Sequence, residues 1–176
     1  HRAIYDQYAP SGTADAEVAV YQPPRAKTPP EVAVHIEFLD CQFKAVPFPY
    51  LLTAATGQVN IWPDRTEILD VRGRHGLATV TVSGEVLTPG GGVPDEVKLK
   101  IFGQDVPLDD DLWQALPDRD RVMLGVFHLS GLADFEGAVT SGAEADAPLD
   151  YDLDIRMRGA RMIYEPFPFQ AEQMTG

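Results

Sequence analysis

The chain reads Ser11-Gly12-Thr13-Ala14-Asp15-Ala16-Glu17 near its start and Ser130-Gly131-Leu132-Ala133-Asp134-Phe135-Glu136 in its second half. The likeness extends in both directions, because residues 1–57 align without a gap on residues 120–176, at an offset of 119 positions. Sixteen of these 57 aligned pairs are identical. A fixed period indicates structural units that stack on one another. A unit of this length has room for several strands.

The repeat also predicts the domain organisation. Residues 1–57 open a first unit that continues through residues 58–119, and residues 120–176 begin the next unit. We therefore treat residues 1–176 as one continuous repeat segment. Because the chain starts partway through one unit and stops partway through the next, we expect it to be a segment cut from a longer array.

Apolar and polar residues alternate in several stretches, a pattern typical of strands with one dry face and one wet face. The clearest stretches are residues 34–38, 79–83, 97–101 and 151–158. Antiparallel sheets show this alternation, whereas parallel strands are usually buried on both faces. We therefore expect an all-β fold built on a twisted, curved antiparallel sheet with one short helix.

Glycine and proline punctuate the chain, with 15 of each among 176 residues, and leave little room for long helices. The one expected helix covers residues 109–116, where Asp109 can cap the first turn and Leu108, Leu112 and Leu116 form one apolar stripe. The predicted strands cover residues 13–21, 31–46, 57–62, 65–72, 76–88, 95–103, 121–128, 131–140 and 149–164.

The composition disfavours several classes of function. The net charge of -13 repels phosphate backbones, so we expect no binding to nucleic acid. Cys41 is the only cysteine, which rules out an intramolecular disulfide and a C-x-x-C metal site. No apolar run is long enough to span a membrane as a helix. The four histidines show no metal-binding spacing. The sequence contains no G-x-S-x-G, P-loop or G-x-G-x-x-G motif. We therefore expect a protein that is not an enzyme, without cofactor or bound metal.

Three polar clusters allow two interpretations each. Asp109-Asp110-Asp111 can suggest a divalent metal, but the EF-hand spacing is absent and helix capping is favoured. Asp150, Asp152 and Asp154 alternate on the polar side of a strand, where cross-strand ion pairs are favoured over a metal. Arg72-Gly73-Arg74-His75-Gly76 can meet an anionic head group, although a solvated hairpin tip is the favoured interpretation.

The order of these elements resembles the AsmA-like superfamily of bacterial envelope proteins, which includes the TamB and YhdP types. The rhythm of that family is a hydrophobic strand, a turn that contains Phe-Pro, a T-G-x-V strand and a G-x-G-x-x-x-V-x-G strand. A short helix stands between such units. The stretches that carry the resemblance are Val34-His35-Ile36-Glu37-Phe38, Pro47-Phe48-Pro49-Tyr50, Thr56-Gly57-Gln58-Val59-Asn60-Ile61, residues 69–84 and residues 107–117.

The resemblance implies a repeating β-groove, which is a long sheet bent into an open trough with an apolar inside and a polar outside. It further implies a non-enzymatic segment of an envelope protein that shields phospholipid acyl chains during transport between membranes. The implied location is the periplasm or cell envelope of a Gram-negative-type bacterium. The implied partners are acyl chains, neighbouring repeats of the same chain, and membranes reached through segments outside this sequence. The acidic balance and the short helix depart from the best-known members, and we expect the N-terminal membrane anchor of the family to lie outside this segment.

Ten apolar residues on the alternating stripes are the candidates for lining this groove. They are Val34, Ile36, Phe38, Val80, Val82, Leu99, Ile101, Leu153, Ile155 and Met157. Because alternation alone also fits a closed core, the alternative is a structural or adhesive β-repeat that binds protein or glycan through its loops. A third alternative, a hydrolase, would need a polar pocket that gathers Asp or Glu with His.

Overall fold

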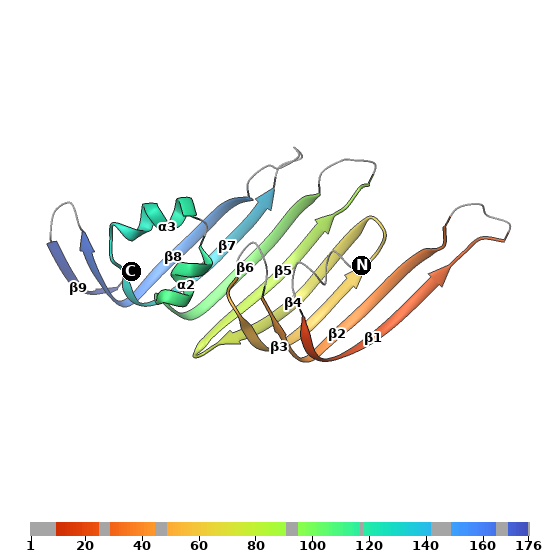
Figure 1. The fold of residues 1–176 in the computed structure, drawn as a ribbon, viewed down its shortest axis with the longest axis horizontal. Coiled ribbons are helices and arrows are strands. Elements are labelled where there is room, and N and C mark those ends of the chain that lie inside the picture. The colour runs from red at the N-terminus through yellow and green to blue at the C-terminus, as the bar shows by residue number, and fades with distance from the viewer. Residues whose placement is uncertain are drawn as a thin grey trace.

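The structure is a computed structural model, and it describes residues 10–24, 29–44, 49–90, 95–116, 118–141, 149–164 and 169–175. Nine strands form one sheet in the order β1-β2-β3-β4-β5-β6-β7-β8-β9, and every neighbouring pair is antiparallel (Figure 1). Two short helices, α2 and α3, lie between β6 and β7 in the sequence. The elements are β1 Ser11–Tyr21, β2 Glu31–Phe43, β3 Leu52–Ile61, β4 Arg65–His75, β5 Ala78–Leu87, β6 Glu96–Pro107, α2 Asp110–Ala115, α3 Asp118–Gly125, β7 Ser130–Ser141, β8 Leu149–Tyr164 and β9 Phe169–Thr175.

The all-β, antiparallel expectation is confirmed. Each strand pairs with the strand that precedes it in the sequence, and the connection from β6 to β7 contains the two helices. The turn between β4 and β5 holds only Gly76 and Leu77, and Gly76 takes the left-handed conformation (φ 59°) that a tight turn needs. The chain does not close on itself, because β1 and β9 stand at opposite ends of the strand order.

One predicted strand is wrong. Residues 121–128 were expected to be extended, but Asp118–Gly125 form helix α3. The sheet explains the difference, because β6 pairs directly with β7 and leaves residues 121–128 no strand to pair with. The acidic residues Asp118 and Asp120 in the first turn suit the positive end of a helix. Strand β9 was not predicted, and β3 begins five residues earlier than expected, at Leu52.

Bulges interrupt the ladders near one end of the strands. The register shifts at Ala54 in β3, at Asp70 in β4 and at Asp105 in β6, and these three residues have φ between 48° and 55°. A bulge bends its strand and increases the local twist, so a series of bulges on adjacent strands curves a sheet. The two Pro-Phe-Pro stretches of the sequence also suggest bends that would curve the sheet. Pro47, Phe48 and residues 166–168 lie outside the described residues.

The sheet has almost no sealed core. Among the described residues, the buried apolar side chains are mostly alanines, and the largest one below 2% exposure is Val106. The chain exposes 11884 Å² to solvent, whereas a compact monomer of 19.3 kDa exposes about 8,500 Å². No second sheet covers the first within the described ranges. A β-sandwich therefore does not describe this part of the chain.

Close backbone approach at Gly84 gives a test of the ladder between β5 and β6. Gly84 has φ 142°, and a Cβ there would collide with the carbonyl oxygen of Lys98. We expect Gly84→Ala to destabilise the protein by about 2 kcal/mol or more, because the strand must shift or strain. Thermal unfolding followed by circular dichroism measures this loss.

The matched control is Gly125→Ala. Gly125 ends helix α3, and no atom lies within 4 Å of a Cβ built there. The free energy of unfolding of this variant should lie within about 0.5 kcal/mol of that of the parent protein, as it does for most surface substitutions. Equal stability of the two variants would contradict the register between β5 and β6.

Candidate functional site

Direct cross-strand pairs place one continuous apolar row across eight strands. Two directly paired residues of an antiparallel ladder point to the same side of the sheet. The row passes from β1 to β8 through pairs in which every member is apolar or glycine. Its members are Ala16, Ile36, Val59, Ile68, Gly84, Leu99, Val139 and Tyr151.

The adjacent row lies one position away on every strand and points to the opposite side of the sheet. All of its members are polar. Its members are Glu17, His35, Asn60, Glu67, Glu85, Lys98, Thr140 and Asp150. Hydrogen bonds connect part of this row, since His35 Nδ1 lies 2.7 Å from Asn60 Oδ1. The sheet therefore has one apolar face and one polar face over eight of its strands.

All ten predicted groove residues lie on the apolar face. Further pairs connect Val82 to Ile101 and Val80 to Gly103, and the same face continues on β8 through Leu153 and Ile155. None of the ten is fully buried, and Ile155 is 52% exposed. Side-by-side packing therefore covers these residues only in part, and no second sheet closes over them.

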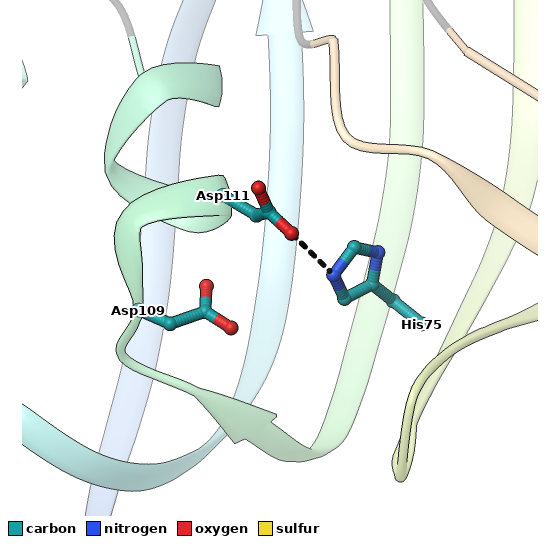
Figure 2. Close-up of side chains that lie close together, drawn as sticks. All are labelled: His75, Asp109 and Asp111. Carbon is teal, nitrogen blue, oxygen red and sulfur yellow. Dashed lines mark ion pairs between the residues drawn. The ribbon is translucent and has the colours of Figure 1, made fainter.

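The apolar face meets helix α2 at the β4–β5 hairpin. His75 pairs with Ala78, two positions along from the Gly73–Val80 pair, so its side chain belongs to the apolar face. Across this end of the sheet, the imidazole Nε2 lies 3.4 Å from Asp111 Oδ2 of α2 (Figure 2). Ligand atoms of His75, Asp109 and Asp111 all lie within 4.8 Å of one another.

Neighbouring groups hold this cluster in place. His75 Nδ1 lies 2.8 Å from the carbonyl oxygen of Leu51, and the Tyr50 ring stacks on the imidazole at 4.1 Å between ring centres. Asp109 Oδ1 accepts a hydrogen bond of 3.0 Å from the Leu112 N–H, so the predicted helix cap is confirmed. Burial, together with the charges of Asp109 and Asp111, raises the pKa of Tyr50 to about 12.

Sequence reasoning treated the members of this cluster separately. His75 was assigned to a hairpin tip together with Arg72 and Arg74, but those arginines lie on polar-face positions, paired with Thr81 and Thr79. For the carboxylates Asp109, Asp110 and Asp111, helix capping was favoured over a divalent metal. Only the fold brings His75 and Asp111 together. The pair combines an acid with a histidine, as a hydrolase requires, but the Asp111 side chain is 68% exposed and the position is open.

On the polar face, an ion-pair network supports the bulge in β6. Asp134 Oδ1 accepts a hydrogen bond of 2.8 Å from the Asp105 backbone N–H, and Arg158 binds both Asp134 and Asp105. Because Asp105 has φ 55°, this bond stabilises a conformation that a non-glycine residue rarely adopts. The bulge leads the chain out of the sheet toward α2. Arg158 of β8 thus pairs with acids of β6 and β7, whereas the cross-strand ion pairs expected for Asp150, Asp152 and Asp154 stay a prediction.

Asp134→Ala should lower the free energy of unfolding by about 1–3 kcal/mol, because it leaves the half-buried Asp105 N–H without this acceptor and Arg158 without its cross-strand carboxylate. Asp154→Ala is the control, since Asp154 is an exposed acid on the same polar face. Urea denaturation measures both variants. A loss as large in Asp154→Ala would show that removing any acid on this face destabilises the sheet.

Within the described part of the chain, neither helix has the length and apolar character needed to cross a membrane. Comparison of the chain with protein-family models, with curated proteins and with solved structures finds no significant match. An assignment of function therefore depends on the two faces of the sheet and on the cluster around His75.

Proposed function

We propose that the apolar face holds lipid acyl chains, as part of a non-enzymatic protein that carries lipid between membranes of a bacterial envelope. The observation that supports this proposal is the apolar row that crosses eight strands without a polar member. Large apolar surfaces that stay exposed in a soluble fold usually bind something. This face also bears Val18 and Val20, which are 59% and 64% exposed.

The chemistry of the face suits an alkyl chain better than a protein segment. A protein strand or loop laid on the face would bring backbone N–H and C=O groups, and burying them against apolar side chains without partners is costly. An acyl chain brings no such groups. Each buried methylene contributes about 0.8 kcal/mol, so a chain of about fourteen methylenes gains of order 10 kcal/mol before the costs of immobilisation.

We further propose that the 119-residue period corresponds to a structural unit whose sheet continues into neighbouring repeats of the same chain. The supporting observation is the register. Ala14 pairs with Phe38 and Ala133 pairs with Met157, which are equivalent positions one period apart. A one-residue register shift interrupts both hairpins, between Thr13 and Ala14 in the first and between Ser130 and Leu132 in the second. Between the next strands, Phe43–Leu52 and Met162–Ala171 are equivalent pairs as well.

Exposure supports the same proposal. Val20 of β1 and Val139 of β7 occupy equivalent positions, yet Val20 is 64% exposed and Val139 only 7%. Strand β7 has β6 on its outer side, whereas no strand among the described residues pairs with the outer side of β1. A strand of the β6 type on β1 would supply the missing neighbour. Membranes would then be reached through segments beyond these residues, in the periplasm or cell envelope.

Charge placed on the apolar face should abolish lipid binding. We expect phospholipid to co-purify with the parent protein and not with the double variant Val80→Asp and Ile155→Asp, because desolvating carboxylates against acyl chains is costly. Native mass spectrometry of the purified proteins detects the bound lipid. The control is Thr81→Asp with Arg156→Asp, which adds two acids at adjacent positions on the polar face.

The control variant should retain lipid and the groove variant should stay folded. If the groove variant unfolds while its control does not, the residues belong to a sealed core and the proposal fails. Lipid-free parent protein, purified from a cell that supplies phospholipid, would also contradict it.

A chimera tests the structural unit. Replacing residues 11–21 by the sequence of residues 130–140 should preserve the sheet, because both segments pair with the following strand in the same register. Amide hydrogen exchange should then protect β2 as in the parent protein. Loss of this protection would mean that the two segments are not interchangeable and that the period has no structural meaning.

A further inference from the structure

We propose that His75, Asp109 and Asp111 bind a divalent metal ion of the zinc type, which fastens helix α2 to the β4–β5 hairpin. The three side chains come from two segments that are far apart in the sequence, and their ligand atoms lie within 4.8 Å of one another (Figure 2). This inference is independent of lipid binding.

The protonation of His75 follows from its partner. Nδ1 lies 2.8 Å from the carbonyl oxygen of Leu51, which can only accept a hydrogen bond, so Nδ1 carries a proton. In the neutral ring, Nε2 then has a lone pair and points at Asp111 Oδ2, which also has only lone pairs to offer. A cation placed between these two atoms would be coordinated by both of them.

The distance between the two atoms suits a bridging metal ion. Nε2 and Oδ2 are 3.4 Å apart, beyond the usual range of a charge-assisted hydrogen bond. Two ligand atoms bound to a tetrahedral zinc ion stand roughly 3.3 Å apart, given metal–ligand bonds of about 2.0–2.1 Å. The observed separation therefore leaves room for an ion between the two atoms.

The surroundings of His75 match those of a metal-binding histidine. Such histidines usually donate the second ring N–H to a carbonyl or carboxylate, which fixes the tautomer and the ring orientation. Leu51 supplies this carbonyl, and the stacked Tyr50 ring limits rotation of the imidazole. The carboxylate of Asp109 is oriented by the Leu112 N–H. These contacts arrange two of the three ligands before any ion binds.

The ligand set selects the class of ion. Calcium and magnesium prefer oxygen ligands alone, whereas an imidazole nitrogen suits zinc and its first-row neighbours. Three protein ligands leave a fourth position for water. Asp109 and Asp111 begin α2 and His75 ends β4, so the ion would join the helix to the end of the apolar face.

Titration with zinc chloride and cobalt chloride tests the site in the whole chain. Isothermal titration calorimetry should show one site of micromolar affinity or tighter, and cobalt should give the visible absorption band of a tetrahedral ion. Asp111→Asn keeps the size of this exposed side chain and should weaken binding at least tenfold. His75→Ala should do the same.

Asp110→Asn is the matched control, because Asp110 lies in the same helical turn and outside the cluster, and its affinity for zinc should equal that of the parent. Equal weakening by Asp110→Asn would mean diffuse attraction to the acidic surface and would overturn the proposal. So would the absence of zinc binding together with nitrogen chemical shifts that show His75 protonated at both ring nitrogens. If His75→Ala fails to fold, Asp111→Asn decides the outcome.

Discussion

The backbone ladder between neighbouring strands is the interaction on which the rest of this molecule depends. A sandwich or barrel gains most of its stability from a sealed core, but among the residues that the structure describes the buried side chains are few and most are small. Eight antiparallel ladders connect all nine strands, and each strand is stabilised mainly by the strands beside it. Stability is then distributed along the sheet, as in repeat proteins whose units contact only their neighbours.

This dependence explains why register matters so much here. A slip of one residue between two strands would place the acids of the polar face among the valines of the apolar face. The bulges and closely approached glycines oppose such a slip, because Gly84 and Gly131 each fit against the backbone of the next strand at one position only. The Asp134–Arg158 pair secures the bulge at Asp105 in the same way. The features that curve the sheet are thus also features that fix its register.

The sequence predicted the two faces well, because the alternation of polarity along a strand is a local property. Val34, Ile36 and Phe38 could be assigned to one face from five consecutive residues. The secondary structure of residues 121–128 could not be predicted. A largely apolar run of that length fits a strand or a helix until the pairing of the neighbouring strands is known. The cluster at His75 was beyond sequence reasoning for a similar reason, because only the fold places His75 beside Asp111.

A comparison of the edge strand β1 with the interior strand β7 shows how far the cover of the apolar face depends on a neighbouring strand. Val20 and Val139 are aligned by the offset of 119 positions, yet Val20 is 64% exposed and Val139 only 7%. The difference measures what an adjacent strand contributes to covering one position of the face. A sheet of this kind therefore becomes more stable with every strand that is added, and its apolar face lengthens by the same step. Growth of the sheet would then also be growth of the proposed lipid-binding surface, which fits a fold that leaves its apolar face without a second sheet among the described residues.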